Sequence, residues 1–101
     1  MIGDVKQNGA FLEIYDEKGA YVADCQGFGD LKGFSRNMLV RENTSFVEIY
    51  DAEGYFVSIL EGFGQVVKVN DETILRQDGA ILTEYDRRGK RVRDLEGDSL
   101  P

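Results

Sequence analysis

The sequence predicts an all-β protein of about eleven short antiparallel strands. Three observations carry this prediction: an internal repeat of 35 residues, turn residues at short intervals, and β-branched and aromatic residues between the turns. No segment shows apolar residues at helical spacing over the length of a helix. We therefore expect the 101 residues to form one domain built from strands.

The repeat is visible in one short motif and in the residues around it. Tyr15-Asp16, Tyr50-Asp51 and Tyr85-Asp86 are 35 residues apart, as are Gly19, Gly54 and Gly89. This alignment divides the chain at about residues 9–43, 44–78 and 79–101, with the last copy incomplete. Matches at many positions in one register indicate internal duplication.

The turn residues divide each copy into about four strands. In the first part of the chain we expect strands at 2–7, 10–16, 20–26 and 30–34, with the series restarting at 37 and 72. Asn8-Gly9 and Asp78-Gly79 are typical of tight hairpins, because both turn positions tolerate φ > 0. Asp16 and its equivalents precede a glycine by three residues, so we expect longer loops in which the Asp side chain accepts turn N–H groups. Gly27-Phe28-Gly29 and Gly62-Phe63-Gly64 are expected to be corners between strands.

The second strand of each copy has apolar residues on both of its faces. Phe46 and Tyr50 alternate with Val47 and Ile49, so this strand is expected either to be covered on both sides or to lie at a subunit contact. We therefore expect either a closed barrel, a pseudo-threefold trefoil-like fold, or small blade-like sheets. Three blades do not close a ring by themselves, so the last arrangement requires a partner chain.

The third copy carries a short resemblance to a known repeat. Its segment from Gly79 to Gly89, with the core Tyr85-Asp86-x-x-Gly89, resembles the YD repeat of Rhs-type shell proteins. The resemblance covers about a dozen residues per copy, and YD repeats are shorter than 35 residues. It implies strand hairpins and transfers no activity to this chain.

Composition excludes several classes of partner. A formal charge of −7 disfavours nucleic acid and anionic membrane surfaces, which both require Lys and Arg. No apolar run approaches the roughly 20 residues of a membrane span. The single cysteine, Cys25, cannot close an internal disulfide. We therefore expect a cytoplasmic protein that contacts neither nucleic acid nor membrane.

The residue types disfavour an enzyme. The chain has no histidine, which removes the usual triads, imidazole acid–base chemistry and typical zinc sites. Cys25 aligns with Leu60 and Leu95, so its position calls for an apolar core residue. We expect no cofactor and no metal.

Two groups of carboxylates have structural explanations. Glu13 and Glu48 resemble a catalytic pair, but we expect either a salt bridge, with Arg41 or Arg76, or a solvated position on the strand. Asp16 and its equivalents would have to converge on an axis to bind Ca²⁺, and turn capping already explains them.

Two groups of residues are candidate contact sites. The first is a basic strip in the last hairpin, which is either a charged edge that prevents aggregation or a contact for an acidic surface such as a second copy. It comprises Arg87, Arg88, Lys90, Arg91 and Arg93. The second group is Tyr15, Tyr50 and Tyr85, whose rings are suited to stacking on sugars. The leading hypothesis is a non-enzymatic protein-binding module that self-associates, and the alternative is a carbohydrate-binding domain.

Overall fold

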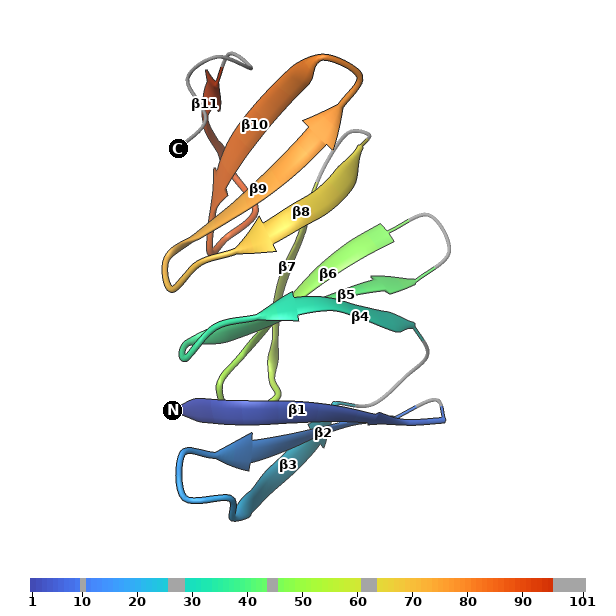
Figure 1. Ribbon diagram of the computed structural model, residues 1–101, viewed down its shortest axis with the longest axis vertical. Coiled ribbons are helices and arrows are strands. Elements are labelled where there is room, and N and C mark those ends of the chain that lie inside the picture. The colour runs from blue at the N-terminus through green and yellow to red at the C-terminus, as the bar shows by residue number, and fades with distance from the viewer. Residues whose placement is uncertain (10, 26–28, 44–45, 61–63, 96–101) are drawn as a thin grey trace.

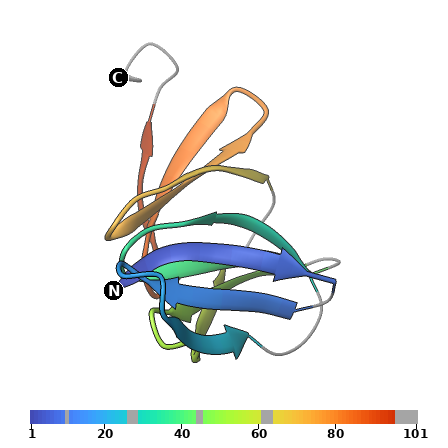
Figure 2. The same cartoon turned by 60° about the horizontal axis from the view of Figure 1, so that its bottom comes forward.

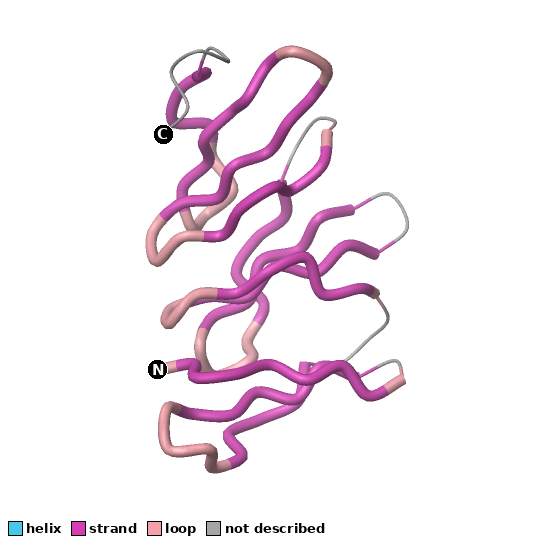
Figure 3. The backbone as a smooth tube through the Cα atoms, in the orientation of Figure 1, coloured by secondary structure: helices cyan, strands magenta, loops and turns pink. Residues whose placement is uncertain are grey.

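The computed structural model describes residues 1–9, 11–25, 29–43, 46–60 and 64–95, and all regular structure in these residues is β-strand (Figures 1 and 3). The expected corners at Phe28 and Phe63 lie outside the described residues. The strands are β1 (Ile2–Asn8), β2 (Phe11–Asp16), β3 (Tyr21–Cys25), β4 (Asp30–Phe34), β5 (Met38–Asn43), β6 (Phe46–Asp51), β7 (Phe56–Leu60), β8 (Gln65–Val69), β9 (Thr73–Asp78), β10 (Ile81–Asp86) and β11 (Arg91–Leu95). The all-β prediction is confirmed.

The strands form three small antiparallel sheets rather than one closed sheet. Their orders are β1-β2-β3, β4-β5-β6-β7 and β8-β9-β10-β11, and we name them sheets 1, 2 and 3. The expectation of a closed barrel is wrong for the described part of the chain, and a trefoil is not confirmed. The physical reason is that the sheets bury their apolar faces by packing against one another, so closure of a single sheet is not needed for burial.

The sheets divide the chain differently from the expected copies. The first strands of sheets 2 and 3, β4 and β8, begin 35 residues apart, and so do their last strands, β7 and β11. However, the copy borders near residues 43 and 78 fall at the β5–β6 and β9–β10 hairpins, inside a sheet. Each four-stranded sheet therefore contains the last two strands of one expected copy and the first two strands of the next.

The aspartate loops have the predicted local structure. In the β6–β7 loop, Asp51 Oδ1 accepts the backbone N–H groups of Glu53 and Tyr55, each at 2.9 Å. Asp16 and Asp86 accept the N–H groups two and four residues later in the same way. The glycine of each loop has φ between 82° and 87°, a conformation that other residues rarely adopt.

Two apolar clusters hold the three sheets together. The first lies between sheets 1 and 2 and contains Ile2, Val5, Leu12, Ile14, Cys25, Leu39 and Tyr50. The second lies between sheets 2 and 3 and contains Met38, Val40, Val47, Ile49, Leu60 and Ile74, with Tyr85 packed against it. Sheet 2 is therefore covered on both faces, as its two-sided apolar pattern predicted.

The sheets fan out from their first strands. β4 contacts both β1 and β8. The last strands lie far from one another: β3 and β11 are at opposite ends of the molecule, and β7 is between them at the back of the view in Figure 1 (Figures 1 and 2). Each internal interface joins two different faces, which we name here. The aliphatic face carries Leu12 and Ile14 or their equivalents, and the tyrosine face carries Tyr50 or Tyr85.

The central cluster generates a stability prediction. Ile49 is fully buried between sheets 2 and 3, whereas Ile81 is 54% exposed on β10. Ile49→Ala is expected to lower the free energy of unfolding by about 2–5 kcal/mol, because it removes buried methyl groups and leaves a cavity. Ile81→Ala, the same chemical change, should stay within about 0.5 kcal/mol. Urea unfolding followed by circular dichroism would measure both, and equal losses would contradict the assigned core.

Candidate functional site

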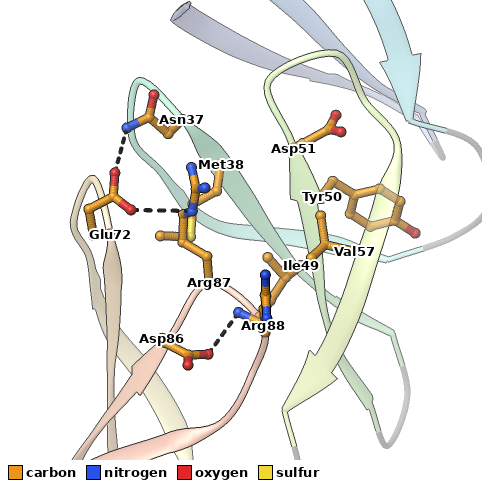
Figure 4. Close-up of a pocket in the computed structure, with 10 residues that line it drawn as sticks. All are labelled: Asn37, Met38, Ile49, Tyr50, Asp51, Val57, Glu72, Asp86, Arg87 and Arg88. Atoms are coloured by element: carbon orange, nitrogen blue, oxygen red, sulfur yellow. Dashed lines mark hydrogen bonds and ion pairs between the residues drawn. The ribbon is translucent and has the colours of Figure 1, made fainter.

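A groove between sheets 2 and 3 has both apolar and charged walls. Its volume is about 440 Å³, and Figure 4 shows its lining. The lining residues are Asn37, Met38, Ile49, Tyr50, Asp51, Val57, Glu72, Asp86, Arg87 and Arg88. Met38 and Ile49 are buried and form an apolar floor, and the charged residues come from the loops at the ends of the strands. Such a combination is suited to a partner with both apolar and charged groups.

Glu72 connects the loops around the groove. The Asn37 side-chain amide donates a hydrogen bond to Glu72 at 3.2 Å, and Arg87 Nε lies 3.3 Å from the other Glu72 oxygen (Figure 4). Next to them, Arg36 pairs with Asp71 at 2.9 Å, and its hydrogen bonds lower the pKa of Asp71. These contacts hold the β4–β5, β8–β9 and β10–β11 loops in fixed relation.

Arg88 supplies the available positive charge of the groove. Its backbone N–H donates a hydrogen bond to Asp86 Oδ1, and its side chain makes no ion pair with any residue that the structure describes. Arg87, by contrast, is paired with Glu72. An anionic group that enters the groove would therefore meet Arg88 first.

Tyr50 directs its hydroxyl group away from the groove. The hydroxyl donates to Glu48 at 3.2 Å and also contacts the buried Arg41. Arg41 donates to Glu48 at 3.0 and 3.1 Å and lies 4.7 Å from the centre of the Tyr50 ring. This network pairs a charged group that is only 2% exposed between sheets 1 and 2. The expected pairing of Glu48 with Arg41 is confirmed.

The three candidate stacking tyrosines have different environments. Tyr50 is 6% exposed and belongs to the core. Tyr85 packs against the second cluster. Tyr15 is half-buried, with Lys6 5.0 Å from its ring centre and Tyr21 packed edge-on. The three rings therefore do not present equivalent open surfaces to a sugar.

The five basic candidates also separate in space. Arg87 and Arg88 line the groove, and Lys90 is exposed in the loop. Arg91 pairs with Asp94 on β11. Arg93 pairs with Glu84 at 3.0 Å on the face of sheet 3 that points away from sheet 2. They are thus a basic end of the molecule rather than one continuous strip.

Cys25 is a buried core residue. The Cys25 thiol is fully buried, and burial raises its pKa to about 11 despite the opposing effect of Arg41. A thiol with this pKa is a poor nucleophile at neutral pH. Among the described residues, no three Cys, Asp or Glu side chains are grouped closely enough to hold a metal ion.

One surface was not predicted from the sequence. On β7 and the loop before it, four large apolar side chains are exposed: Tyr55 at 71%, Phe56 at 57%, Val57 at 41% and Ile59 at 36%. We name these four residues the β7 patch. The signal in the sequence is the uncharged run from residue 55 to 60, in a chain that is 31% charged.

Comparisons with known proteins assign no family. The chain matches no protein-family model, and a search of curated proteins finds no relative. In the described residues, no helix has the length and apolar character that a membrane span requires.

The buried network generates a second prediction. Glu48→Gln is expected to lower the free energy of unfolding by about 2–3 kcal/mol, because buried Arg41 keeps its charge and loses its carboxylate. Glu13 occupies the equivalent position on sheet 1, where its neighbour Lys6 is exposed. Glu13→Gln should therefore change stability by no more than about 0.5–1 kcal/mol. Chemical unfolding of both variants would measure the difference, and similar losses would contradict the role of the buried pair.

Cys25 generates a third prediction, which concerns alkaline pH. Because the pKa of the folded thiol is raised from 9.0 to about 11, its contribution to stability is fully present below pH 9 and is lost as pH rises toward about 11. The slope of unfolding free energy against pH in this window should be less steep in Cys25→Ala than in the wild type. Tyrosines titrate in both proteins, so the difference isolates the thiol. Parallel pH profiles would contradict the burial of Cys25.

Proposed function

We propose that this chain is a non-enzymatic β module that binds other proteins and associates with itself. The observation that carries the proposal is the β7 patch, a group of exposed apolar side chains on the uncharged last strand of sheet 2, of which Tyr55 and Phe56 lie toward sheet 1 and Val57 lies toward the groove. Exposed patches of this kind mark interaction surfaces more often than isolated apolar residues do. The lone buried thiol of Cys25 is consistent with a reducing compartment such as the cytoplasm.

The other two last strands support this assignment by contrast. β3 carries the exposed Asp24, and β11 carries Arg91, Arg93 and Asp94. Charged residues on edge strands prevent unwanted pairing, and β7 has none. Uncharged edge strands are sites at which proteins accept another chain.

The side chains of β7 favour recognition through aromatic groups. Val57 is an extra residue that interrupts the regular pairing of β7 with β6. Because such a bulge twists the strand, it opposes a long added strand and favours contacts with side chains. Tyr55 and Phe56 are the residue types that supply most of the binding energy in protein interfaces.

The groove beside the patch indicates the chemistry of the partner. Val57 belongs both to the β7 patch and to the wall of the groove, where Arg88 is available. A segment with an apolar side chain next to a carboxylate would therefore contact both surfaces. The partner proposed here is an exposed protein segment of that composition.

The second candidate function is the binding of a small ligand such as a carbohydrate. The groove of about 440 Å³ favours it, since its size is within the range of small-molecule sites. Tyr50 contributes to the wall, although its ring is largely buried. A glycan array on which the wild-type protein binds nothing would end the carbohydrate version.

Binding through the β7 patch has a matched test. Phe56→Glu places a charge in the patch, and Phe46→Glu makes the same change at a residue of similar exposure on β6. Proteins captured by the immobilised wild type would be quantified by mass spectrometry against both variants. The captured amount of a genuine partner should fall about tenfold or more with Phe56→Glu and should change little with Phe46→Glu. Equal capture by all three proteins would contradict the role of β7.

A further inference from the structure

The two end sheets each have one face on which no other sheet packs. Sheet 1 presents outward a tyrosine face that comprises Asp4, Lys6, Glu13, Tyr15, Tyr21 and Asp24. Sheet 3 presents outward an aliphatic face that comprises Lys68, Leu75, Leu82, Glu84, Arg93 and Leu95, of which Leu82 is already buried at 5% exposure. The free faces are therefore of the two different kinds that pack together inside the molecule.

The free tyrosine face has the same arrangement as its buried counterpart. On sheet 2, Arg41 lies over Tyr50, whose hydroxyl donates to Glu48, and sheet 1 covers this group. On sheet 1, Lys6 lies over Tyr15, whose hydroxyl donates to Glu13 at 3.2 Å. The exposed face is thus already formed in the geometry that accepts an aliphatic face elsewhere in the same chain.

The loop glycines also show that sheet 1 lacks a packing contact that the equivalent loops of sheets 2 and 3 make. A Cβ on Gly54 would lie 3.3 Å from Ile14 and 3.5 Å from Ala23, because this loop packs on the sheet before it. A Cβ on Gly89 would lie 2.5 Å from the Ile59 carbonyl oxygen for the same reason. A Cβ on Gly19, the equivalent loop residue of sheet 1, would have no described residue other than its chain neighbours within 4 Å.

The fan of sheets indicates what fills these positions. β4 contacts both β1 and β8, whereas β3 and β11 lie at opposite ends of the molecule (Figures 1 and 2). Further sheets stacked in the same way would therefore be arranged in a ring around an axis beside the first strands. Two copies supply six sheets, within the range of roughly four to eight that close into a ring. A head-to-tail contact that closes after two copies gives a symmetric dimer with two identical junctions.

We propose that two copies of this chain close into a ring, with the free tyrosine face of each docked on the free aliphatic face of the other. The inference rests on the self-association included in the proposed function and names its geometry. Charge supports the second copy as the occupant. The free tyrosine face carries Asp4, Glu13 and Asp24 against Lys6, and the free aliphatic face carries Lys68 and Arg93 against Glu84, so opposite net charges meet at each junction.

The junctions between copies are more polar than the interfaces within a copy. Asp4 occupies the position of the buried Leu39 and Ile74, and Glu84 occupies that of the buried Ile14 and Ile49. Lys6 and Arg93 lie on the same faces and offset these acids. The dimer is therefore separable and is weakened by salt, whereas the sheets within each copy stay packed.

Two changes of opposite direction test the ring. Asp4→Leu with Glu84→Ile gives both faces the residues of the internal interfaces, and the dissociation constant of the dimer should fall about tenfold or more. Arg93→Glu adds a third acid beside Glu84 and the Asp4 of the other copy at each junction. The dissociation constant of the dimer should therefore rise about tenfold or more. Lys90→Glu makes the same charge change at the position equivalent to Tyr55 of sheet 2. Tyr55 is 71% exposed even though sheet 1 packs on the tyrosine face of sheet 2, so Lys90→Glu should have little effect.

Sedimentation equilibrium over a wide concentration range would give the mass and dissociation constant, with circular dichroism to show that each variant is folded. A dimer with the predicted order of affinities supports the ring. A wild type and a double variant that are both monomeric overturn it and the self-association together. A dimer insensitive to Arg93→Glu overturns the ring and leaves self-association standing. Masses that keep growing beyond the dimer show open chains and also overturn the ring.

Discussion

The structure depends on the packing of an aliphatic sheet face against a tyrosine face. Each sheet has an apolar face that must be buried against another layer, because exposed apolar area is unfavourable in water. Ile14 and Ile49 supply this apolar area from one side, and Leu39 and Ile74 supply it from the other, all fully buried. Sheet 2 takes part in both interfaces, so it determines the relative position of the other two.

The buried charge of Arg41 shapes the surface on which sheet 1 packs. Arg41, Glu48 and the Tyr50 hydroxyl all belong to sheet 2 and are joined by hydrogen bonds within it. The network therefore fixes the side chains of the tyrosine face of sheet 2, without adding much stability. On the outer face of sheet 1, Lys6 has the flexible, solvated charge that an open surface tolerates.

Local structure was predictable from the sequence because it depends on nearby residues. Asp51 and Gly54 fix a loop through hydrogen bonds within five residues, and eleven strands follow from such loops. The division into sheets was not predictable, because no local residue shows whether a strand pairs with the one before it or the one after it. The repeat gives the interval between equivalent strands but not the strand at which a sheet begins.

The environment of the candidate site residues depended on long-range packing. Tyr15 and Tyr50 have the same neighbours in the sequence, yet only Tyr50 has a sheet packed on its face. The β7 patch was missed because an uncharged edge strand has the composition of a buried one. Arg88 could be named from the sequence, but its place in the groove results from the packing of sheet 3 on sheet 2.

The strand order has a consequence for how the chain folds. Within every sheet, each strand is hydrogen-bonded to the strand that precedes or follows it in the chain. Such hairpin contacts close short loops, so their entropic cost is small and they form early. We infer that the chain folds quickly for an all-β protein, with hairpins appearing first and the docking of sheets 1 and 3 onto sheet 2 as the late, cooperative step.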